Sequence, residues 1–148
     1  MKGQITILYA EDDSDDRMLM KDALGEAGLQ CDLRFVSDGE ETMDYLLRRG
    51  QYASDAAPRP QMILLDLNMP KKGGLEVLAE IKCNPNLWQI LVVVWTSSKL
   101  EADLWSAYDC GATAYVKKPS SFRGLVKALG ALNSWWLETA ALPPPHSV

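Results

Sequence analysis

The stretch "ILLDLNMP", residues 63–70, decides the fold because it carries one carboxylate straight out of an apolar run. Asp66 lies in the segment "QMILLDL" (61–67), and a polar, glycine-rich turn follows at 68–74. A short apolar run that ends at a turn is typical of a strand buried on both faces of a parallel sheet. The surroundings of Asp66 therefore depend on which other strands end at the same edge of that sheet.

The composition is that of an ordinary globular domain. The chain has 148 residues, of which 47% are hydrophobic and 24% are charged, enough for one domain with its own core. The net charge of −5 and the lack of a basic cluster argue against nucleic acid as a direct partner. There is no signal peptide and no apolar run of about 18 residues, so we expect a cytoplasmic protein that does not span a membrane.

The cysteines and the histidine give no sign of a metal or catalytic site. Cys31, Cys83 and Cys110 are odd in number and widely spaced, which fits neither a zinc site nor a disulfide framework. We expect reduced thiols, in keeping with the cytosol. His146 lies in a proline-rich tail (141–148) that is predicted to be disordered, so we assign it no catalytic role.

Short apolar runs alternate with amphipathic segments along the whole chain. The predicted strands are residues 5–10, 31–37, 61–67, 90–96 and 113–119. The predicted helices are residues 14–28, 39–50, 74–85, 99–111 and 121–140. Ser14 is a plausible N-cap of the first helix, with Asp15 and Asp16 at its positive end. The alternation predicts an α/β fold, a doubly wound five-stranded parallel sheet with helices on both faces.

The ends of the predicted strands carry a consistent set of polar residues. In a doubly wound sheet, reactive groups gather outside the carboxyl ends of the strands. These ends hold Glu11, Asp12 and Asp13 on the first strand, Asp66 on the third, Thr96 and Ser97 on the fourth, and Lys118 and Pro119 on the fifth. We therefore expect one cluster of carboxylates with a hydroxyl and an ammonium beside them.

Such a cluster suits phosphoryl transfer onto a carboxylate. Crowded carboxylates repel one another, and a divalent cation or a lysine relieves that repulsion. Oxygen ligands without histidine or cysteine select magnesium or manganese. Asp66 would be the nucleophile, and Thr96 and Lys118 would hold the transferring group. Taken singly, each residue also has a plain explanation as a cap, a solvated helix start or a surface turn, so the hypothesis depends on their coincidence.

Taken in order, four motifs resemble the receiver domain of two-component response regulators. They are Glu11–Asp12 after the first strand, "DLNMP" with Asp66, "WTSS" with Thr96 and "YVKKP" with Lys118. The resemblance covers roughly residues 4–132 and implies a flavodoxin-like sheet with strand order 2-1-3-4-5. It assigns residues 1–132 to the receiver domain and 133–140 to an extension of the last helix.

The resemblance also implies a metal site and a phosphorylation site. Asp66 would accept a phosphoryl group from a sensor histidine kinase. Asp12, Asp66 and the backbone carbonyl of Asn68 would bind Mg²⁺ or Mn²⁺, with Glu11 in support, through water. The protein would be a signalling phosphoacceptor that catalyses its own phosphorylation and dephosphorylation. It would not be an enzyme that acts on a separate metabolite.

Other positions carry the phosphoryl contacts and the switch of that family. Thr96 and Lys118 would hold the phosphoryl group, and Tyr115 occupies the aromatic switch position. Lys117 stands beside Lys118, and we choose Lys118 because it directly precedes a proline. Trp95 stands where the family more often has a smaller aliphatic residue; it either fills the core or alters the switch path.

A finer resemblance concerns the partner kinase. The loop "RRGQYASDAAPRP" (48–60) and the segment "ILLDLNMPKKGGLEVLAEIK" (63–82) resemble stand-alone regulators of phytochrome-type histidine kinases. The sequence ends without a DNA-binding or enzymatic output domain, which suits that subgroup. We therefore expect a kinase of the bacteriophytochrome type as the partner.

Four aromatic residues near the end of the chain suggest a contact surface. Trp105 and Tyr108 lie on the predicted fourth helix, and Trp135 and Trp136 lie near the end of the fifth. Aromatic side chains that cannot all be buried mark interfaces, which gives the hypothesis of a homodimer through these two helices. The alternative is a last helix that simply packs on its own sheet.

Three rival functions fit the sequence less well. A haloacid dehalogenase type phosphatase would need an acid where Asn68 stands, together with a lid domain. A degenerate receiver, acting as an interaction module without phosphorylation, would not be expected to keep Asp66, Thr96 and Lys118. Neither glycine-rich nucleotide-binding motif follows the first predicted strand.

Overall fold

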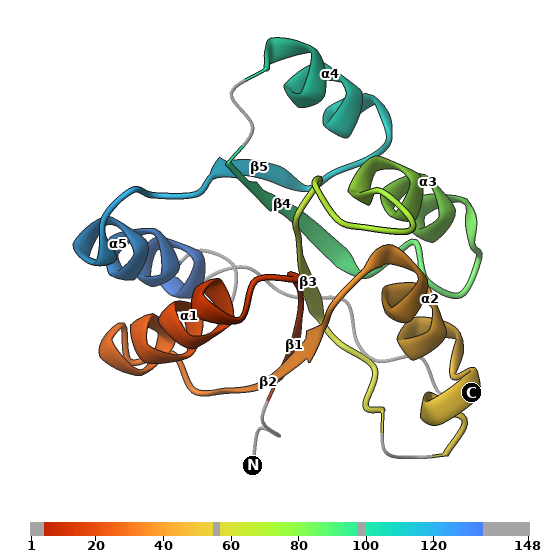
Figure 1. Ribbon diagram of the computed structural model, residues 1–148, viewed down its shortest axis with the longest axis horizontal. Coiled ribbons are helices and arrows are strands. Elements are labelled where there is room, and N and C mark those ends of the chain that lie inside the picture. The colour runs from red at the N-terminus through yellow and green to blue at the C-terminus, as the bar shows by residue number, and fades with distance from the viewer. Residues whose placement is uncertain (1–4, 55–56, 98–99, 135–148) are drawn as a thin grey trace.

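The predicted α/β architecture is confirmed. The computed structural model of the protein describes residues 5–54, 57–97 and 100–134. Its five strands run parallel in the order β2-β1-β3-β4-β5, which is the expected order (Figure 1). Their bounds are β1 Ile5–Ala10, β2 Cys31–Val36, β3 Met62–Leu65, β4 Leu91–Thr96 and β5 Ala114–Lys117.

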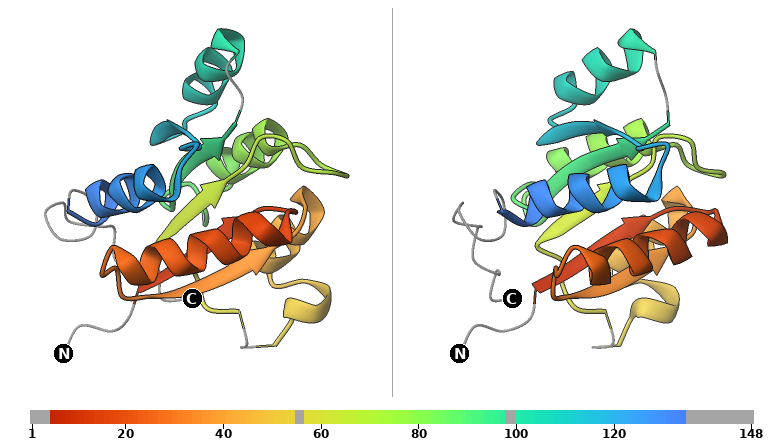
Figure 2. Two further views of the ribbon diagram at one scale, coloured as in Figure 1. Left: turned by 60° about the vertical axis from the view of Figure 1, so that its left-hand side comes forward. Right: turned by 90° about the vertical axis from the view of Figure 1, so that its left-hand side faces the viewer.

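Helices cover both faces of this sheet. They are α1 Ser14–Glu26, α2 Gly39–Leu47, the short 3-10 helix η1 Gly50–Tyr52, α3 Gly74–Cys83, α4 Glu101–Asp109 and α5 Phe122–Leu132. The helices α1 and α5 lie side by side on one face, and α2 and α3 lie on the other (Figures 1 and 2). The helix α4 lies beside β5, at one end of the sheet.

The core consists of two apolar layers, one on each face of the sheet. Successive side chains of a strand point to opposite faces, so every central strand supplies both layers. The layer under α1 and α5 includes Ile7, Met20, Leu24, Trp95 and Leu129. The layer under α2, α3 and α4 includes Leu8, Ile63, Leu65, Val77, Leu78, Val92 and Ala107. Trp95 is only 1% exposed, so this indole fills the core.

The start of α1 corrects one sequence-based prediction. The N-cap is Asp13 and not Ser14, which is already the first helical residue. The Asp13 carboxylate accepts the backbone N–H groups of Asp15 (2.8 Å) and Asp16 (3.2 Å). Asp13 has the extended conformation that an N-cap requires, and its carboxylate satisfies two of the free helix donors.

The end of the chain leaves other predictions untested. Helix α5 is described to Leu132, with Asn133 as its C-cap. Of the predicted helix extension at 133–140, only residues 133 and 134 are described, and the tail at 141–148 lies outside the described residues. Within the described part of the chain, no helix is long and apolar enough to cross a membrane.

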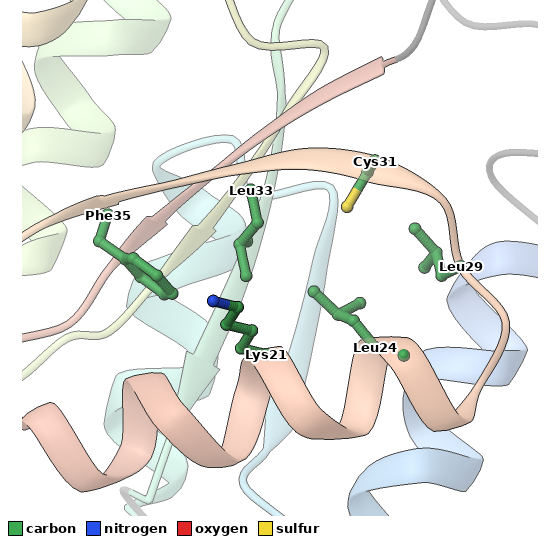
Figure 3. Close-up of a pocket in the computed structure, with 7 residues that line it drawn as sticks. Lys21, Leu24, Leu29, Cys31, Leu33 and Phe35 are labelled. Carbon is green, nitrogen blue, oxygen red and sulfur yellow. The ribbon is translucent and has the colours of Figure 1, made fainter.

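A groove of mixed polar and apolar lining runs between α1 and the edge strand β2 (Figure 3). Its volume is about 290 Å³. The residues that line it are Lys21, Leu24, Gly25, Leu29, Cys31, Leu33 and Phe35. Side chains of α1 and β2 point toward one another across it, and those of β2 remain half-buried because no further strand follows.

Two glycines place the turn after β3. A Cβ atom on Gly74 would overlap the backbone of Asp66 and Leu67, so the start of α3 lies directly against the end of β3. A Cβ atom on Gly39 would overlap the carbonyl of Lys72, so the same turn also packs against the start of α2. Glycine is required at both places because only a bare backbone leaves room for the close approach.

We expect alanine to have opposite effects at two glycines. Gly74→Ala would lower the free energy of unfolding by about 1–3 kcal/mol, because the start of α3 and the backbone of Asp66 and Leu67 must move apart. Gly25→Ala, inside α1 with open space around its Cβ position, would raise it by about 0.5–1 kcal/mol through helix propensity. Urea titrations followed by circular dichroism measure both changes, and a neutral Gly74→Ala variant would contradict the proposed close packing.

Candidate functional site

Three carboxylates meet at the carboxyl edge of the sheet. Oxygen atoms of Glu11, Asp12 and Asp66 all lie within 4.8 Å of one another. The strands β1 and β3 pair in register, Ala10 beside Leu65, so the residues that follow them are brought together. Glu11 and Asp66 are buried at 1% and 4% exposure, whereas Asp12 is exposed. The cluster expected from the strand ends is therefore present, with one member open to solvent.

Lys118 is the cation of this cluster. Its Nζ donates to Oε1 of Glu11, to Oδ2 of Asp66 at 3.1 Å and to Oδ2 of Asp16 at 3.2 Å. Its backbone N–H donates to the carbonyl of Thr96 at 2.8 Å, which extends the pairing of β4 and β5 by one residue. Of the two adjacent lysines, Lys118 thus reaches the carboxylates, while Lys117 is exposed.

The electrostatics of the pair formed by Lys118 and Glu11 follow from burial and opposite charge. Burial alone would lower the pKa of Lys118, but the hydrogen bond to Glu11 and the charge of Asp66 outweigh it and raise the pKa. Burial raises the pKa of Glu11, and the bond to Lys118 opposes that rise. Each charge is tolerated in this site because the other one is present.

Glu11 has further donors that the sequence analysis missed. The hydroxyl of Tyr9 donates to Oε1 of Glu11 at 3.3 Å, and the backbone N–H of Asp13 donates to Oε2 at 3.2 Å. Burial and the charge of Glu11 raise the pKa of Tyr9, which therefore stays a neutral donor. A tyrosine two residues before an acid on a strand shares its face, and that spacing was the available signal.

Arg17 fixes the junction between β1 and α1. Its Nε donates to the carbonyl of Glu11 at 2.7 Å, and its Nη2 donates to the Ser37 hydroxyl at 2.7 Å. The guanidinium also lies over the ring of Phe35, 5.3 Å from its centre. These contacts tie the first acidic strand end to the end of β2, so the position of Glu11 is set from both sides.

The turn after β3 folds back on Asp66. The backbone N–H of Asn68 donates to Oδ1 of Asp66 at 3.1 Å, and that of Gly74 donates to the carbonyl of Leu67 at 3.1 Å. Lys71 has a positive φ of 66°, which reverses the chain toward α3. Asn68 itself is exposed at the rim, beside the carboxylate that it orients.

Thr96 and Tyr115 occupy the two strands beside this rim. Thr96 is fully buried at the end of β4, opposite Lys117 of β5. Tyr115 is half-buried and packs against the layer under α2, α3 and α4. Its backbone N–H donates to the hydroxyl of Tyr108 at 3.2 Å. The roles of Thr96 as a phosphoryl donor and of Tyr115 as a switch stay predictions.

The expected aromatic surface is described only in part. Trp105 is 64% exposed and Tyr108 is 47% exposed, both on α4. Trp135 and Trp136 lie outside the described residues. Phe122, the first residue of α5, is 41% exposed.

The donor set at the rim fits a hard divalent cation. Three carboxylates converge there, and they come from the ends of two adjacent strands. Carboxylate oxygens without histidine or cysteine match the preference of Mg²⁺ and Mn²⁺. The exposed Asp12 leaves one side of the group open to solvent, as an ion that retains water requires.

The fold and this rim define a class of protein. A family model for the response regulator receiver domain matches residues 7–130. The chain belongs to the response regulator receiver family, which the sequence motifs had indicated.

Individual relatives and solved structures are similar to nearly the whole chain. Response regulator Rcp1 of Synechocystis sp. is 42% identical over 137 residues, 93% of this chain and 92% of that protein. The crystal structure of the phosphorylated cyanobacterial phytochrome response regulator RcpA has a TM-score of 0.88 and 40% identity, and the match covers 96% of this chain and 100% of that one. The Mn²⁺-bound form of Rcp1 has a TM-score of 0.86 and 41% identity, with coverage of 95% and 99%. The resemblance to phytochrome response regulators is thus confirmed.

Removal of Lys118 is expected to destabilise the fold. Lys118→Met would lower the free energy of unfolding by about 2–4 kcal/mol near neutral pH, because Glu11 would stay buried without its cation. This loss of stability should become smaller as the pH falls, because protonated Glu11 is neutral and needs no cation. The raised pKa of the Glu11 carboxyl means that the folded state binds its proton more tightly than the unfolded state does, so protonation at low pH favours folding.

Lys117→Met is the matched control for this prediction. Lys117 is exposed, so its loss should change the free energy of unfolding by less than about 0.5 kcal/mol. Urea titrations of both variants between acid and neutral pH measure the two effects. Equal effects of the two substitutions would contradict the assignment of Lys118 as the buried cation.

Proposed function

We propose that the protein accepts a phosphoryl group from the phosphohistidine of a sensor histidine kinase onto Asp66. The observation that carries this proposal is the ammonium of Lys118, 3.1 Å from Oδ2 of Asp66, on a rim shared with Glu11 and Asp12. A carboxylate with a fixed cation beside it, at the carboxyl edge of a parallel sheet, is positioned for phosphoryl transfer. The receiver family and the similarity to phosphorylated RcpA support it.

In the proposed reaction, a carboxylate oxygen of Asp66 attacks the phosphorus atom. The new O–P bond gives an acyl phosphate, and the P–N bond to the kinase histidine breaks with its electron pair left on the imidazole nitrogen. Lys118 neutralises charge on the phosphoryl oxygens, and the Thr96 hydroxyl donates to one of them. The backbone N–H of Asn68 keeps the Asp66 side chain oriented. Attack of water on the acyl phosphate breaks the O–P bond, releases inorganic phosphate and returns the resting carboxylate.

Asp12, Asp66 and the backbone carbonyl of Asn68 would hold Mg²⁺ or Mn²⁺, with Glu11 in support. The ion would supply positive charge that offsets the charges of the carboxylates and the phosphoryl group. Support comes from the converging oxygens in this chain and from the similarity to the Mn²⁺-bound form of Rcp1. Tyr115 would change position when Thr96 turns toward the phosphoryl group, as the aromatic switch of this protein.

A kinase of the bacteriophytochrome type is the proposed partner. The similarity to RcpA, described as a phytochrome response regulator, supports this choice, and we place the reaction in the cytoplasm. Phosphotransfer from purified phytochrome-type and unrelated histidine kinases tests it. Transfer that is no faster from the phytochrome-type kinases than from the others would contradict the partner assignment.

A homodimer through α4 and α5 is the proposed assembly. The support is the high exposure of Trp105 and Tyr108 on α4. Multi-angle light scattering at tens of micromolar, with and without beryllofluoride as a phosphoryl mimic, should detect the dimer. Trp105→Ala should weaken it, whereas Trp88→Ala, at a site 54% exposed beyond α3, should not. A monomer under both conditions would end the proposal.

Acetyl phosphate with Mg²⁺ tests the phosphoacceptor directly. We expect a labile mass gain of one phosphoryl group in the wild type and none in Asp66→Asn, which lacks the nucleophilic oxygen. Chelation of the metal should suppress the gain. Asp22→Asn, an exposed site on α1, should be modified like the wild type. A gain that persists in Asp66→Asn would place the phosphoryl group elsewhere.

A further inference from the structure

All three N–H donors of the Lys118 ammonium are hydrogen-bonded in the resting protein. An ammonium donates three hydrogen bonds, and three carboxylates accept them here, those of Glu11, Asp16 and Asp66. Asp16 comes from the first turn of α1 and belongs to neither strand end that carries the metal ligands. It is thus an additional counter-ion of the lysine on which phosphoryl transfer depends.

We propose that Asp16 acts through Lys118, as a resting-state counter-ion that keeps a hydrogen bond of the lysine occupied until a phosphoryl donor arrives. The inference depends on the proposed phosphorylation of Asp66. When the donor approaches, its oxygens become a fourth acceptor for three protons, so one carboxylate must release the lysine. The Asp16 carboxylate is the one that yields.

Burial decides which carboxylate yields. Glu11 has a side chain only 2% exposed and further donors in Tyr9 and Asp13, so its separation from Lys118 would leave a buried charge unpaired. Asp66 is not the one that yields, because it is itself the reacting group and has to stay beside the lysine for the transfer. The side chain of Asp16 is 40% exposed and lies at the positive end of α1, where water and the helix dipole can stabilise the free carboxylate.

The contact between Asp16 and Lys118 in the resting protein therefore adds a barrier to phosphorylation of Asp66. The hydrogen bond between Asp16 and Lys118 must break before the O–P bond forms, which adds to the free-energy barrier. The negative charge of Asp16 also repels the anionic donor. Removal of that charge should therefore speed phosphorylation and tighten the binding of a phosphoryl mimic. A residue that merely anchored Lys118 in its productive place would have the opposite effect, because its loss would leave the lysine less well positioned.

The test compares Asp16→Asn with Asp15→Asn at saturating Mg²⁺. Asp15 is the preceding exposed acid of the same helix turn, so its substitution removes the same charge without a contact to Lys118. We expect Asp16→Asn to raise the acetyl phosphate reaction rate and the affinity for beryllofluoride about three- to tenfold. Asp15→Asn should leave both within about twofold. Asp16→Glu, which keeps the charge within reach of Lys118, should resemble the wild type.

The possible outcomes separate the inference from the function beneath it. A rate in Asp16→Asn equal to that of Asp15→Asn, or slower than the wild type, would overturn the role of Asp16 while the function stands. A wild type that takes up neither acetyl phosphate nor beryllofluoride would overturn the proposed function and the inference together. Asp16→Ser gives a second reading of the same charge loss with a residue that helix starts favour.

Discussion

One ammonium among carboxylates is the interaction on which the rest of this structure depends. Like charges at the edge of a sheet oppose folding, and here they are held together by Lys118, which contacts Glu11 and Asp66 in a largely buried site. Such a pair contributes little net stability once desolvation is counted. Its value is geometric, because it holds a reactive carboxylate at a defined place beside a fixed positive charge.

The parallel sheet brings the acidic groups to that place. β1 and β3 end at the same level, and Glu11 and Asp66 follow them. The turn after β3 then has to fold back within a very short distance, which Gly74 permits and a larger residue would prevent. Arg17 secures the opposite side of the rim through the carbonyl of Glu11. The backbone connections therefore bring the acidic residues to the rim, where the side chains of Lys118 and Arg17 hold them.

The sequence predicted the elements, the fold and the gathering of acids, because burial on both faces and residue type at strand ends follow from local pattern. It did not predict the partners of individual side chains. The N-cap is Asp13 and not Ser14, because Ser14 already has helical geometry and Asp13, just before it, is extended and accepts the free N–H groups. The spacing of Tyr9 and Glu11 places both on one face of the strand, but their hydrogen bond also depends on rotamers. The contact of Asp16 with Lys118 depends on the phase of α1 over the sheet, which no short window of sequence encodes.

The backbone bond from Lys118 to the carbonyl of Thr96 has a mechanical consequence. It joins the tips of β4 and β5 into one hydrogen-bonded piece, so the backbones of Thr96 and Lys118 are directly connected. The same piece continues to Tyr115, whose N–H is bonded to the hydroxyl of Tyr108 on α4. Two hydrogen bonds and one strand thus form a continuous connection from the charged rim to the ring of Tyr108 at the surface of the molecule.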